Sequence, residues 1–223
     1  MMDFAQARAN MIESQVRTNG VTDPRVIATM ALVPREIFVP TPRRAFAYMD
    51  EDVEVAAASA DGPARHLIEP MTFARLVHLL SLEPSDEVLD VGCATGYSTA
   101  VLARIAARVT GLEANAELAA EARTNLDRLG IGNAEIIVGE HAGGVGGRAF
   151  DAVLVNGRIP EVPNRLDAWL KDGGRFAAVV GERDVGKAVL HTRAGSAISV
   201  RAAYDASVAP LPGFTVSKPA FTF

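Results

Sequence analysis

Cysteine, clustered basic charge and long apolar runs are all scarce in this 223-residue chain. Cys93 is the single cysteine, so no disulfide can form within the chain and nothing indicates an oxidising compartment. Residues 1–8 carry charge and lack the apolar core of a signal peptide. Apolar runs such as 176–180 fall far short of the ~20 residues that a membrane span needs. The sequence therefore predicts a cytoplasmic protein that does not enter a membrane.

Basic residues are outnumbered, because 22 Lys and Arg stand against 27 Asp and Glu, for a formal net charge of -5. Since nucleic-acid binding depends on clustered Lys and Arg, this balance argues against a general nucleic-acid surface. The one cysteine and four histidines lack the spacing of a zinc site, so we expect no metal. A hydrophobic content of 49% with 22% charged residues is ordinary for a globular domain and predicts one compact α/β unit.

The stretch 88–97, Val-Leu-Asp-Val-Gly-Cys-Ala-Thr-Gly-Tyr, is the feature around which the chain is organised. Residues 87–91 are apolar and β-branched enough for a buried parallel strand, and residues 98–107 carry apolar side chains at helical spacing. Between them, Gly92 and Gly96 allow positive φ and lack the Cβ atoms that would block a ligand. Backbone N–H groups and a helix N-terminus can therefore face a nucleotide-type ligand here.

The loop also narrows the choice of ligand. A dinucleotide fingerprint needs glycine where this chain has Ala94 and Tyr97, and no Gly-Lys-Ser/Thr follows the loop. A second glycine-rich stretch, 143–147, does not join a strand to a helix with a following lysine, so we interpret it as a loop. S-adenosylmethionine remains, because it has no phosphate and its ribose is held by an acid at the end of the next strand. Glu113 ends such a strand, about 20 residues after Gly92.

Helical spacing is clear in the amino-terminal third. It predicts helices over 4–19, stopped by Gly20, and over 24–32, opened by Asp23 as N-cap. Prolines then interrupt the chain up to residue 70, a segment that we interpret as a cap or lid. A further helix is expected over 70–82.

Strands and helices alternate regularly from residue 87 onward. The predicted strands and helices are 87–91, 98–107, 109–113, 116–129, 134–138, 150–155, a helix through 170 capped by Asn164, and 175–180. Segments 188–192 and 198–203 flank Gly195 as an antiparallel hairpin would. This order predicts an α/β fold with a Rossmann-like, doubly wound sheet, mostly parallel, with helices on both faces. We expect a helical cap over 1–84 and the ligand-binding core over 85–223.

Five motifs then point to one family. They are Pro-Arg-Glu-Ile-Phe-Val at 34–39, Tyr48, the loop 88–97, Phe-Asp-Ala-Val-Leu-Val at 150–155, and residues 162–175 with their Leu-Lys-Asp-Gly-Gly-Arg end. Over about residues 10–190 the chain resembles the protein-L-isoaspartate O-methyltransferases. The resemblance implies a class I S-adenosylmethionine-dependent methyltransferase fold. It also implies a monomer or homodimer that methylates the α-carboxylate of isoaspartyl residues in a damaged protein or peptide, a protein repair step.

The resemblance further implies where the cofactor binds. Its contacts would come from the loop and from the ends of the neighbouring strands, and Glu140 would accept a hydrogen bond from the adenine amino group. The residues implied are Asp90, Gly92, Cys93, Ala94, Thr95, Gly96, Tyr97, Glu113, Ala114, Glu140, His141 and Asn156.

The chain departs from the family where the acceptor should bind. Members usually carry Ile-Ser-Gln-Pro, with the serine hydroxyl at the reaction centre, but residues 67–70 are Leu-Ile-Glu-Pro. Ile68 therefore replaces the serine, and Glu69 adds a negative charge. We place the catalytic centre at four residues, His66, Ile68, Glu69 and Thr72. Arg65 and His66 could pair with Glu69 or bind a substrate carboxylate.

The expected chemistry needs no general base, because an aspartyl-type carboxylate with a pKa near ~3.9 is already ionised at neutral pH. The protein has to align the reacting atoms and exclude water. Glu69 would oppose such an acceptor, since two like charges ~4 Å apart repel by roughly 4 kcal/mol at an effective dielectric of about 20. Two alternatives therefore stay open. One is a different methyl acceptor with Glu69 as base, and the other is a cofactor-binding module that has lost catalysis.

Overall fold

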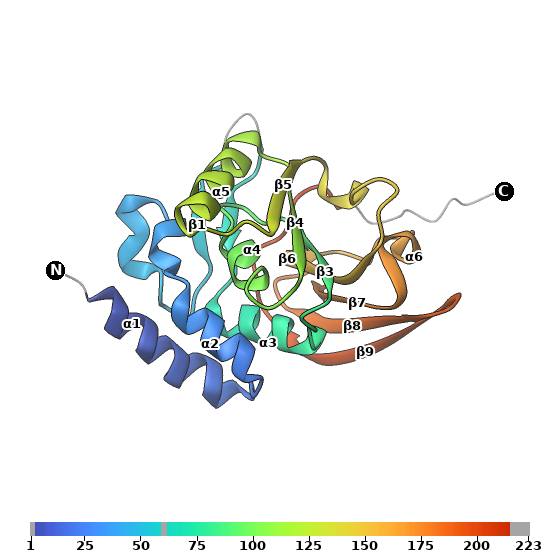
Figure 1. The fold of residues 1–223 in the computed structure, drawn as a ribbon, viewed down its shortest axis with the longest axis horizontal. Coiled ribbons are helices and arrows are strands. Elements are labelled where there is room, and N and C mark those ends of the chain that lie inside the picture. Colours follow the sequence, from blue (N-terminus) through green and yellow to red (C-terminus); the bar gives the residue numbers. More distant parts are fainter. Residues whose placement is uncertain (1–2, 59–61, 215–223) are drawn as a thin grey trace.

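A seven-stranded sheet in the order β5-β4-β3-β6-β7-β8-β9 forms the centre of the computed structural model, which describes residues 3–58 and 62–214 (Figure 1). Residues 1–2, 59–61 and 215–223, parts of the predicted cap and core, lie outside the described residues. Neighbours from β5 to β7 are parallel, and β7, β8 and β9 pair antiparallel. The strands are β3 (Glu87–Val91), β4 (Arg108–Glu113), β5 (Ala134–Val138), β6 (Phe150–Ile159), β7 (Leu170–Val180), β8 (Gly186–Ala194) and β9 (Ala197–Ala206). The predicted α/β sheet and its carboxyl-terminal hairpin are confirmed.

The amino-terminal helices also follow the prediction. Helix α1 (Phe4–Met11) continues through a π-helical turn, Ile12–Val16, and a 3-10 turn, Arg17–Asn19, until Gly20 ends it at φ +78°. Helix α2 (Pro24–Leu32) has Asp23 as its N-cap, and the Asp23 side chain accepts the N–H of Arg25. A left-handed glycine such as Gly20 stabilises the end of a helix, and a short polar side chain such as Asp23 stabilises the start of the next one.

The proline-rich segment holds more structure than the sequence suggested. It contains two 3-10 turns, Arg35–Phe38 and Thr41–Phe46, and an antiparallel pair of strands, β1 (Val53–Ala56) and β2 (Arg65–Leu67). Helix α3 (Pro70–Leu80) follows. Since β2 leads directly into α3, it delivers the expected acceptor residues to the edge of the central sheet.

Two clusters of buried side chains lie on opposite faces of the sheet, because residues alternate between them along β3 and β6. Helices α3, α4 (Tyr97–Leu102) and α5 (Ala116–Arg128) contribute to the first cluster, together with α1 and α2. The second cluster lies under α6 (Leu166–Trp169) and irregular segments. Helices thus lie on both faces of the sheet, with more of them on the face of the first cluster.

The predicted division of the chain at residue 84, between a helical cap and a core, stays a prediction. The first cluster contains residues from both sides of this boundary.

The helix predicted over 98–107 is too long. Helix α4 ends at Leu102, and turns lead to β4. The backbone N–H groups of Ala107 and Arg108 donate to the carbonyl of Asp86 at 3.0 and 3.3 Å. These bonds draw the chain away from the helix axis and into the strand, although the apolar spacing continues.

The helix predicted up to residue 170 is also wrong in its boundaries. Helix α6 has four residues, and its N-cap is Arg165, with no side-chain cap, so Asn164 does not cap it. Leu170 already belongs to β7. A helix of a single turn carries too little periodicity to be located from sequence.

The strand order places a topological switch point at β3. The chain proceeds outward from β3 to β4 and β5, and then returns to the other side of β3 as β6. Ligands of open parallel sheets bind outside the carboxyl ends of the strands at such a point. Gly92, Glu113 and Asn156 all lie at this edge, after β3, at the end of β4 and within β6.

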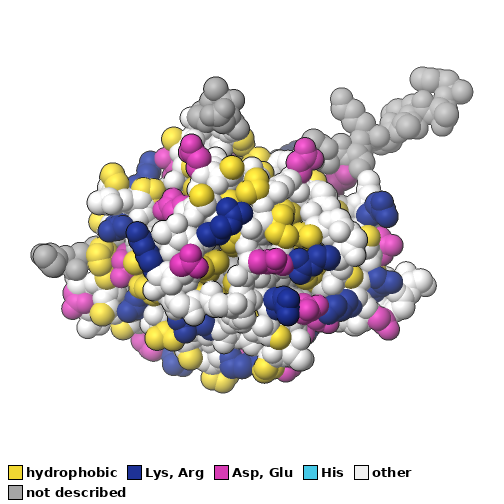
Figure 2. Space-filling model, turned by 45° about the horizontal axis from the view of Figure 1, so that its top comes forward, with side chains coloured by type: hydrophobic (Ala, Val, Ile, Leu, Met, Phe, Trp, Pro, Cys, Tyr) yellow, Lys and Arg dark blue, Asp and Glu magenta, His cyan; other side chains and the backbone are white. Residues whose placement is uncertain are grey.

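The surface offers no simple clue to a partner. On the face shown in Figure 2, basic and acidic side chains are interspersed. Across residues 3–58 and 62–214, no helix has the length and apolarity that a bilayer span requires.

Candidate functional site

The loop after β3 turns sharply, as its glycines predicted. Gly92, Ala94 and Gly96 have φ of +75°, +48° and +94°. A Cβ on Gly96 would lie 3.1 Å from the Cβ of Ala122, so this glycine also lets α5 approach the loop. The loop is therefore a tightly packed turn, and it also presents backbone atoms at the edge of the sheet where a ligand could bind.

Glu113 is fully buried at the end of β4, opposite the loop. Its Oε2 accepts the N–H of Ala94 at 2.8 Å, and its Oε1 accepts the N–H of Asn115 at 3.1 Å. Arg65 Nη2 donates to Oε2 at 2.8 Å, and His141 Nε2 lies 3.5 Å from Oε1. Burial alone raises the pKa of Glu113, but the His141 and Arg65 side chains outweigh it and hold the pKa far below its usual range. The carboxylate is thus ionised and well supplied with donors.

The pairing of Arg65 with Glu113 corrects the expectation that Arg65 serves Glu69 or a substrate. On β2, Arg65 and Leu67 face the interior, while His66 is half-buried. Alternate residues of a strand face opposite sides, so an inward Arg65 reaches the sheet edge. The sequence offered one clue, the inward Leu67 two residues away, but not the identity of the partner.

Asp90 lies on the same edge and is also fully buried. Ser98 Oγ and Thr99 Oγ1 donate to its Oδ2 at 2.7 and 2.6 Å, and Asn156 Nδ2 donates to its Oδ1. Burial raises the pKa of Asp90 to about 6 in spite of these donors. Two of the predicted cofactor residues, Asp90 and Asn156, are therefore joined directly to each other.

Changing Asp90 to asparagine should make stability less dependent on pH. Because the folded protein raises this pKa from 3.8 to about 6, the stabilisation is complete below pH ~4 and is lost as the pH rises through 6. Relative to the parent, the variant should gain on the order of 1–3 kcal/mol between pH 4 and 7. Urea unfolding at a series of pH values measures this difference. Parallel curves for the two proteins would show that Asp90 does not titrate in this range.

The expected acceptor residues divide between two cavities. Ile68 lines a small inner chamber beside Gly92 and Asn156. Glu69 instead lines an open cavity of about 500 Å³ on the outer surface, and Thr72 Oγ1 donates to its carboxylate. His66 borders both spaces. Glu69 thus points away from the inner chamber. Its charge would therefore not oppose an acceptor bound in that chamber.

Asp52 organises the outer cavity and was not anticipated from the sequence. Its carboxylate accepts the backbone N–H groups of Glu69 at 2.8 Å and of Ala209 at 2.5 Å. Burial raises the pKa of Asp52, and burial also raises the pKa of Glu69, with further contributions from the charges of Asp50 and Asp52. These carboxyl groups are therefore more basic than exposed ones.

Three loop side chains point into the protein. Thr95 Oγ1 donates to the carbonyl of Phe38 at 2.7 Å, and the ring of Tyr97 lies under the Arg35 guanidinium at 4.6 Å. Cys93 is buried, and burial raises the pKa of its thiol. Any cofactor contact from Cys93 and Thr95 would therefore come from their backbone, and the role of these residues stays a prediction.

The crevice at the sheet edge is divided in two. Glu113, Ala114, Glu140 and His141 line an outer pocket of about 330 Å³, near the lower end of ligand-site volumes. The inner chamber beside Gly92 offers only about 10 Å³, the space of a single water.

Two side chains, Arg65 and Leu211, lie between these halves. Arg65 Nη2 donates to the carbonyl of Gly92 at 3.2 Å, and a Cβ on Gly92 would lie 2.5 Å from Leu211 Cδ1. The polar groups thus suit an adenosyl ligand, whereas the space over Gly92 is filled. Leu211 was missed because no local pattern links it to a loop so far away in sequence.

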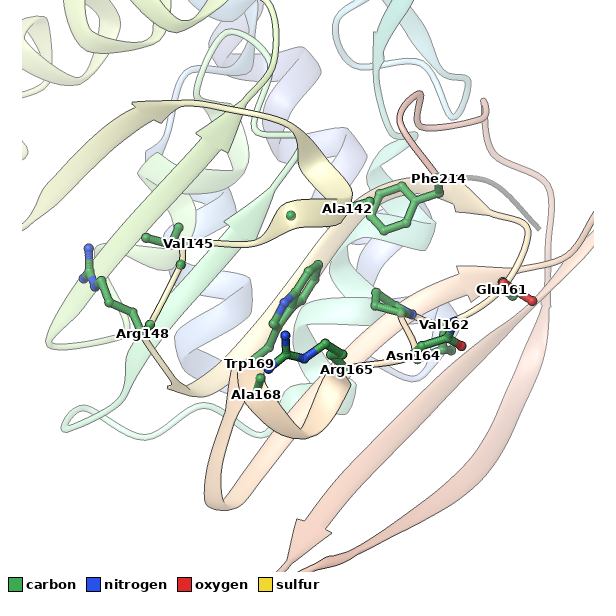
Figure 3. Close-up of a pocket in the computed structure, with 14 residues that line it drawn as sticks. Ala142, Val145, Arg148, Glu161, Val162, Asn164, Arg165, Ala168, Trp169 and Phe214 are labelled. Atoms are coloured by element: carbon green, nitrogen blue, oxygen red, sulfur yellow. The ribbon is translucent and has the colours of Figure 1, made fainter. Parts of the chain in front are cut away.

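A larger cavity of about 470 Å³ lies elsewhere, between the glycine-rich loop and α6 (Figure 3). The rings of Trp169 and Phe214 border it, and a Cβ on Gly144 would lie 2.6 Å from Trp169. It shares no lining residue with the crevice. We therefore assign the site by the sheet edge and not by cavity size.

Comparison with known proteins points in one direction. A family model described as protein-L-isoaspartate(D-aspartate) O-methyltransferase matches residues 6–212. A protein-L-isoaspartate O-methyltransferase of Koribacter versatilis is 37% identical over 183 residues, which is 82% of this chain and 80% of the relative. One of Rhodopseudomonas palustris is 40% identical over 189 residues, 84% of each chain.

Solved structures agree on the fold. A protein-L-isoaspartate O-methyltransferase superposes with a TM-score of 0.81 at 22% identity, covering 92% of this chain and 66% of that one. A putative protein-L-isoaspartate O-methyltransferase of Plasmodium falciparum, solved with S-adenosyl-L-homocysteine, superposes with a TM-score of 0.71 at 21% identity. The match covers 96% of this chain and 100% of that one.

Proposed function

The chain belongs to the protein-L-isoaspartate O-methyltransferase family of S-adenosylmethionine-dependent methyltransferases, and we propose that it methylates the α-carboxylate of isoaspartyl residues in damaged proteins. One observation carries the proposal. Glu113 ends β4 opposite the glycine loop, at the topological switch point of the sheet. A buried, ionised carboxylate in this position is suited to hold the two hydroxyls of a ribose.

The residues around Glu113 suggest how the cofactor would be held. Ala114, Glu140 and His141 line the outer pocket, where an adenine would lie beside the ribose. Asp90 and Asn156 border the far side of the loop. When bound, S-adenosylmethionine would supply the activated methyl group. The chain has to orient the acceptor carboxylate and keep water out.

The inner chamber has one feature that favours an anionic acceptor. Arg35 is 1% exposed and lines this chamber, and its Nη2 donates to the carbonyl of Ile68 at 2.7 Å. Within residues 3–58 and 62–214 its guanidinium forms no ion pair, and the carboxylate whose charge acts on it is that of Asp52. A buried cation without a paired anion would attract an acceptor carboxylate, and the chamber would have to widen beyond the space of a single water to admit one.

Methyl transfer to an isoaspartyl peptide, measured beside its aspartyl twin, tests the proposal. We expect labelled methyl groups from S-adenosylmethionine to enter the isoaspartyl peptide only, at a low rate because Ile68 has no hydroxyl. Calorimetry with S-adenosylhomocysteine serves as the control for cofactor binding. If the cofactor product binds and neither peptide is methylated, the acceptor is a different one.

A second candidate acceptor is favoured by the outer cavity. Asp50, Glu51, Asp52, Glu69 and Asp184 line it, against Arg158 and His66. This charge would repel an anionic peptide and attract an amine, and the raised pKa of Glu69 suits a base. Methylation of a lysine- or arginine-containing peptide, with the isoaspartyl peptide inert, would select this alternative.

The cellular setting forms part of the same proposal. We place the protein in the cytoplasm, because its single cysteine cannot form the disulfides within one chain that are common in exported proteins. We propose that it acts as a monomer or homodimer, which size-exclusion chromatography with light scattering distinguishes.

A further inference from the structure

Arg65 and Leu211 fill the space between the two halves of the crevice. Arg65 borders the outer pocket, and Gly92, which both side chains touch, borders the inner chamber. Arg65 also holds Glu113 through Nη2 and Nε, at 2.8 and 3.3 Å, with the pair 5% and 0% exposed. A ribose hydroxyl that reaches Glu113 must therefore take the place of the guanidinium.

Leu211 is positioned by its own backbone. The N–H of Arg158 donates to the carbonyl of Ala209 at 2.9 Å, and the N–H of Leu211 donates to the carbonyl of Arg158 at 2.8 Å. Gly157 permits this close approach, since a Cβ there would lie 2.8 Å from the Cβ of Leu211. On the outer side, His141 Nδ1 lies 2.8 Å from the carbonyl of Pro212. The segment 209–212 is thus fastened at both ends of the crevice.

The atoms nearest to the space over Gly92 nevertheless belong to side chains. The atoms over Gly92 are the terminal methyls of Leu211 and a terminal nitrogen of Arg65. Both side chains can change rotamer while their backbone bonds remain. Glu113 would keep the N–H groups of Ala94 and Asn115 when Arg65 leaves, so its charge would not be stranded.

We propose that Arg65 and Leu211 form an internal plug that competes with the cofactor for Glu113 and for the space over Gly92. This inference rests on the proposed function, in that the ligand excluded is S-adenosylmethionine. The protein without ligand is mostly closed, and its apparent affinity is reduced by the fraction of molecules in which both side chains have withdrawn. Arg65 thereby sets the cofactor affinity of this chain without touching the acceptor.

Two variants, Arg65→Gln and Leu211→Ala, test the plug separately. We expect each to bind S-adenosylhomocysteine about 10- to 100-fold more tightly than the parent in calorimetry, because the competent fraction rises. A second readout needs no cofactor. The backbone N–H of Ala94 is buried beside the plug and donates to Glu113, so its exchange with deuterium, followed by mass spectrometry, should be faster in both variants.

Arg175→Gln is the matched control. Arg175 pairs with Asp86 at 2.6 Å, beyond the opposite end of β3, so its loss disrupts a partly buried ion pair without opening the crevice. This variant should keep the parent's affinity and the parent's rate of amide exchange at Ala94. Leu211→Ala, which removes no charge, carries the test if Arg65→Gln does not fold.

The outcomes separate the plug from the proposed function. Equal affinity and equal Ala94 exchange in the parent and both variants would overturn the plug while leaving the cofactor assignment in place. Faster Ala94 exchange in both variants, with no S-adenosylhomocysteine bound by any of the proteins, would show that the two side chains close the crevice but would overturn their competition with this cofactor and remove the assignment.

Discussion

Replacing Glu113 with alanine should lower the free energy of unfolding by about 3–5 kcal/mol, because Arg65 would remain buried without its anion. The Arg65 side chain is 5% exposed, and apart from Glu113 its guanidinium donates to the carbonyl of Gly92. The same change should weaken S-adenosylhomocysteine binding by about 1–3 kcal/mol, the range for a lost hydrogen bond to a charged group. Urea unfolding and calorimetry measure the two effects separately.

The double change Glu113→Ala, Arg65→Gln is the control for this prediction. It removes the stranded cation, so it should be more stable than Glu113→Ala alone, and the non-additivity measures the coupling of the pair. Arg65→Gln alone should lower the free energy of unfolding by less than Glu113→Ala, since Glu113 keeps its hydrogen bonds from two backbone N–H groups. If Glu113→Ala leaves stability unchanged, the pair adds nothing to the fold and the plug is weak as well.

Much of the fold follows from local pattern. Asp23 and Gly20 fix the turn between the first two helices because a cap and a left-handed glycine act within a few residues. The strands β3 and β5 were predicted with their observed bounds, since they are short apolar runs between turn residues. The helix predicted over 98–107 is too long because α4 ends at Leu102, and the carbonyl of Asp86, distant in sequence, holds residues 107 and 108 at the start of the next strand.

The site was predictable only in part, for the same reason. The glycine loop and Glu113 are signalled by spacing along one βα unit, and the structure brings them together. The side chains that fill the crevice are not signalled by this spacing, because Arg65 and Leu211 belong to segments before and after that unit. Gly92 illustrates the limit. The sequence predicts room for a ligand where its Cβ is missing, whereas side chains of the chain itself occupy that room.

The double change Ile68→Ser, Glu69→Gln should raise turnover of an isoaspartyl peptide by a factor on the order of 10²–10³, the value of one recovered oxyanion-type donor. Ile68 lines the inner chamber, so a serine there would present a hydroxyl beside Gly92. Glu69 lies in the outer cavity, bonded by Thr72, so its replacement should contribute the smaller share. Steady-state methyl transfer by the double variant and by each single variant measures the two contributions.

Ile68→Ala is the matched control, because it opens the chamber equally without adding a donor. It should leave turnover near that of the parent, whereas Ile68→Ser should account for most of the gain. Both variants shorten a side chain that is 5% exposed, so each should lose about 2–5 kcal/mol of stability, and the rates are compared well below their midpoints. Equal gains from alanine and serine would mean that space, and not a hydroxyl, limits the reaction. A parent that is already fast, and slower after the double change, would mean that another donor, such as His66 or the buried Arg35, has replaced the family's serine.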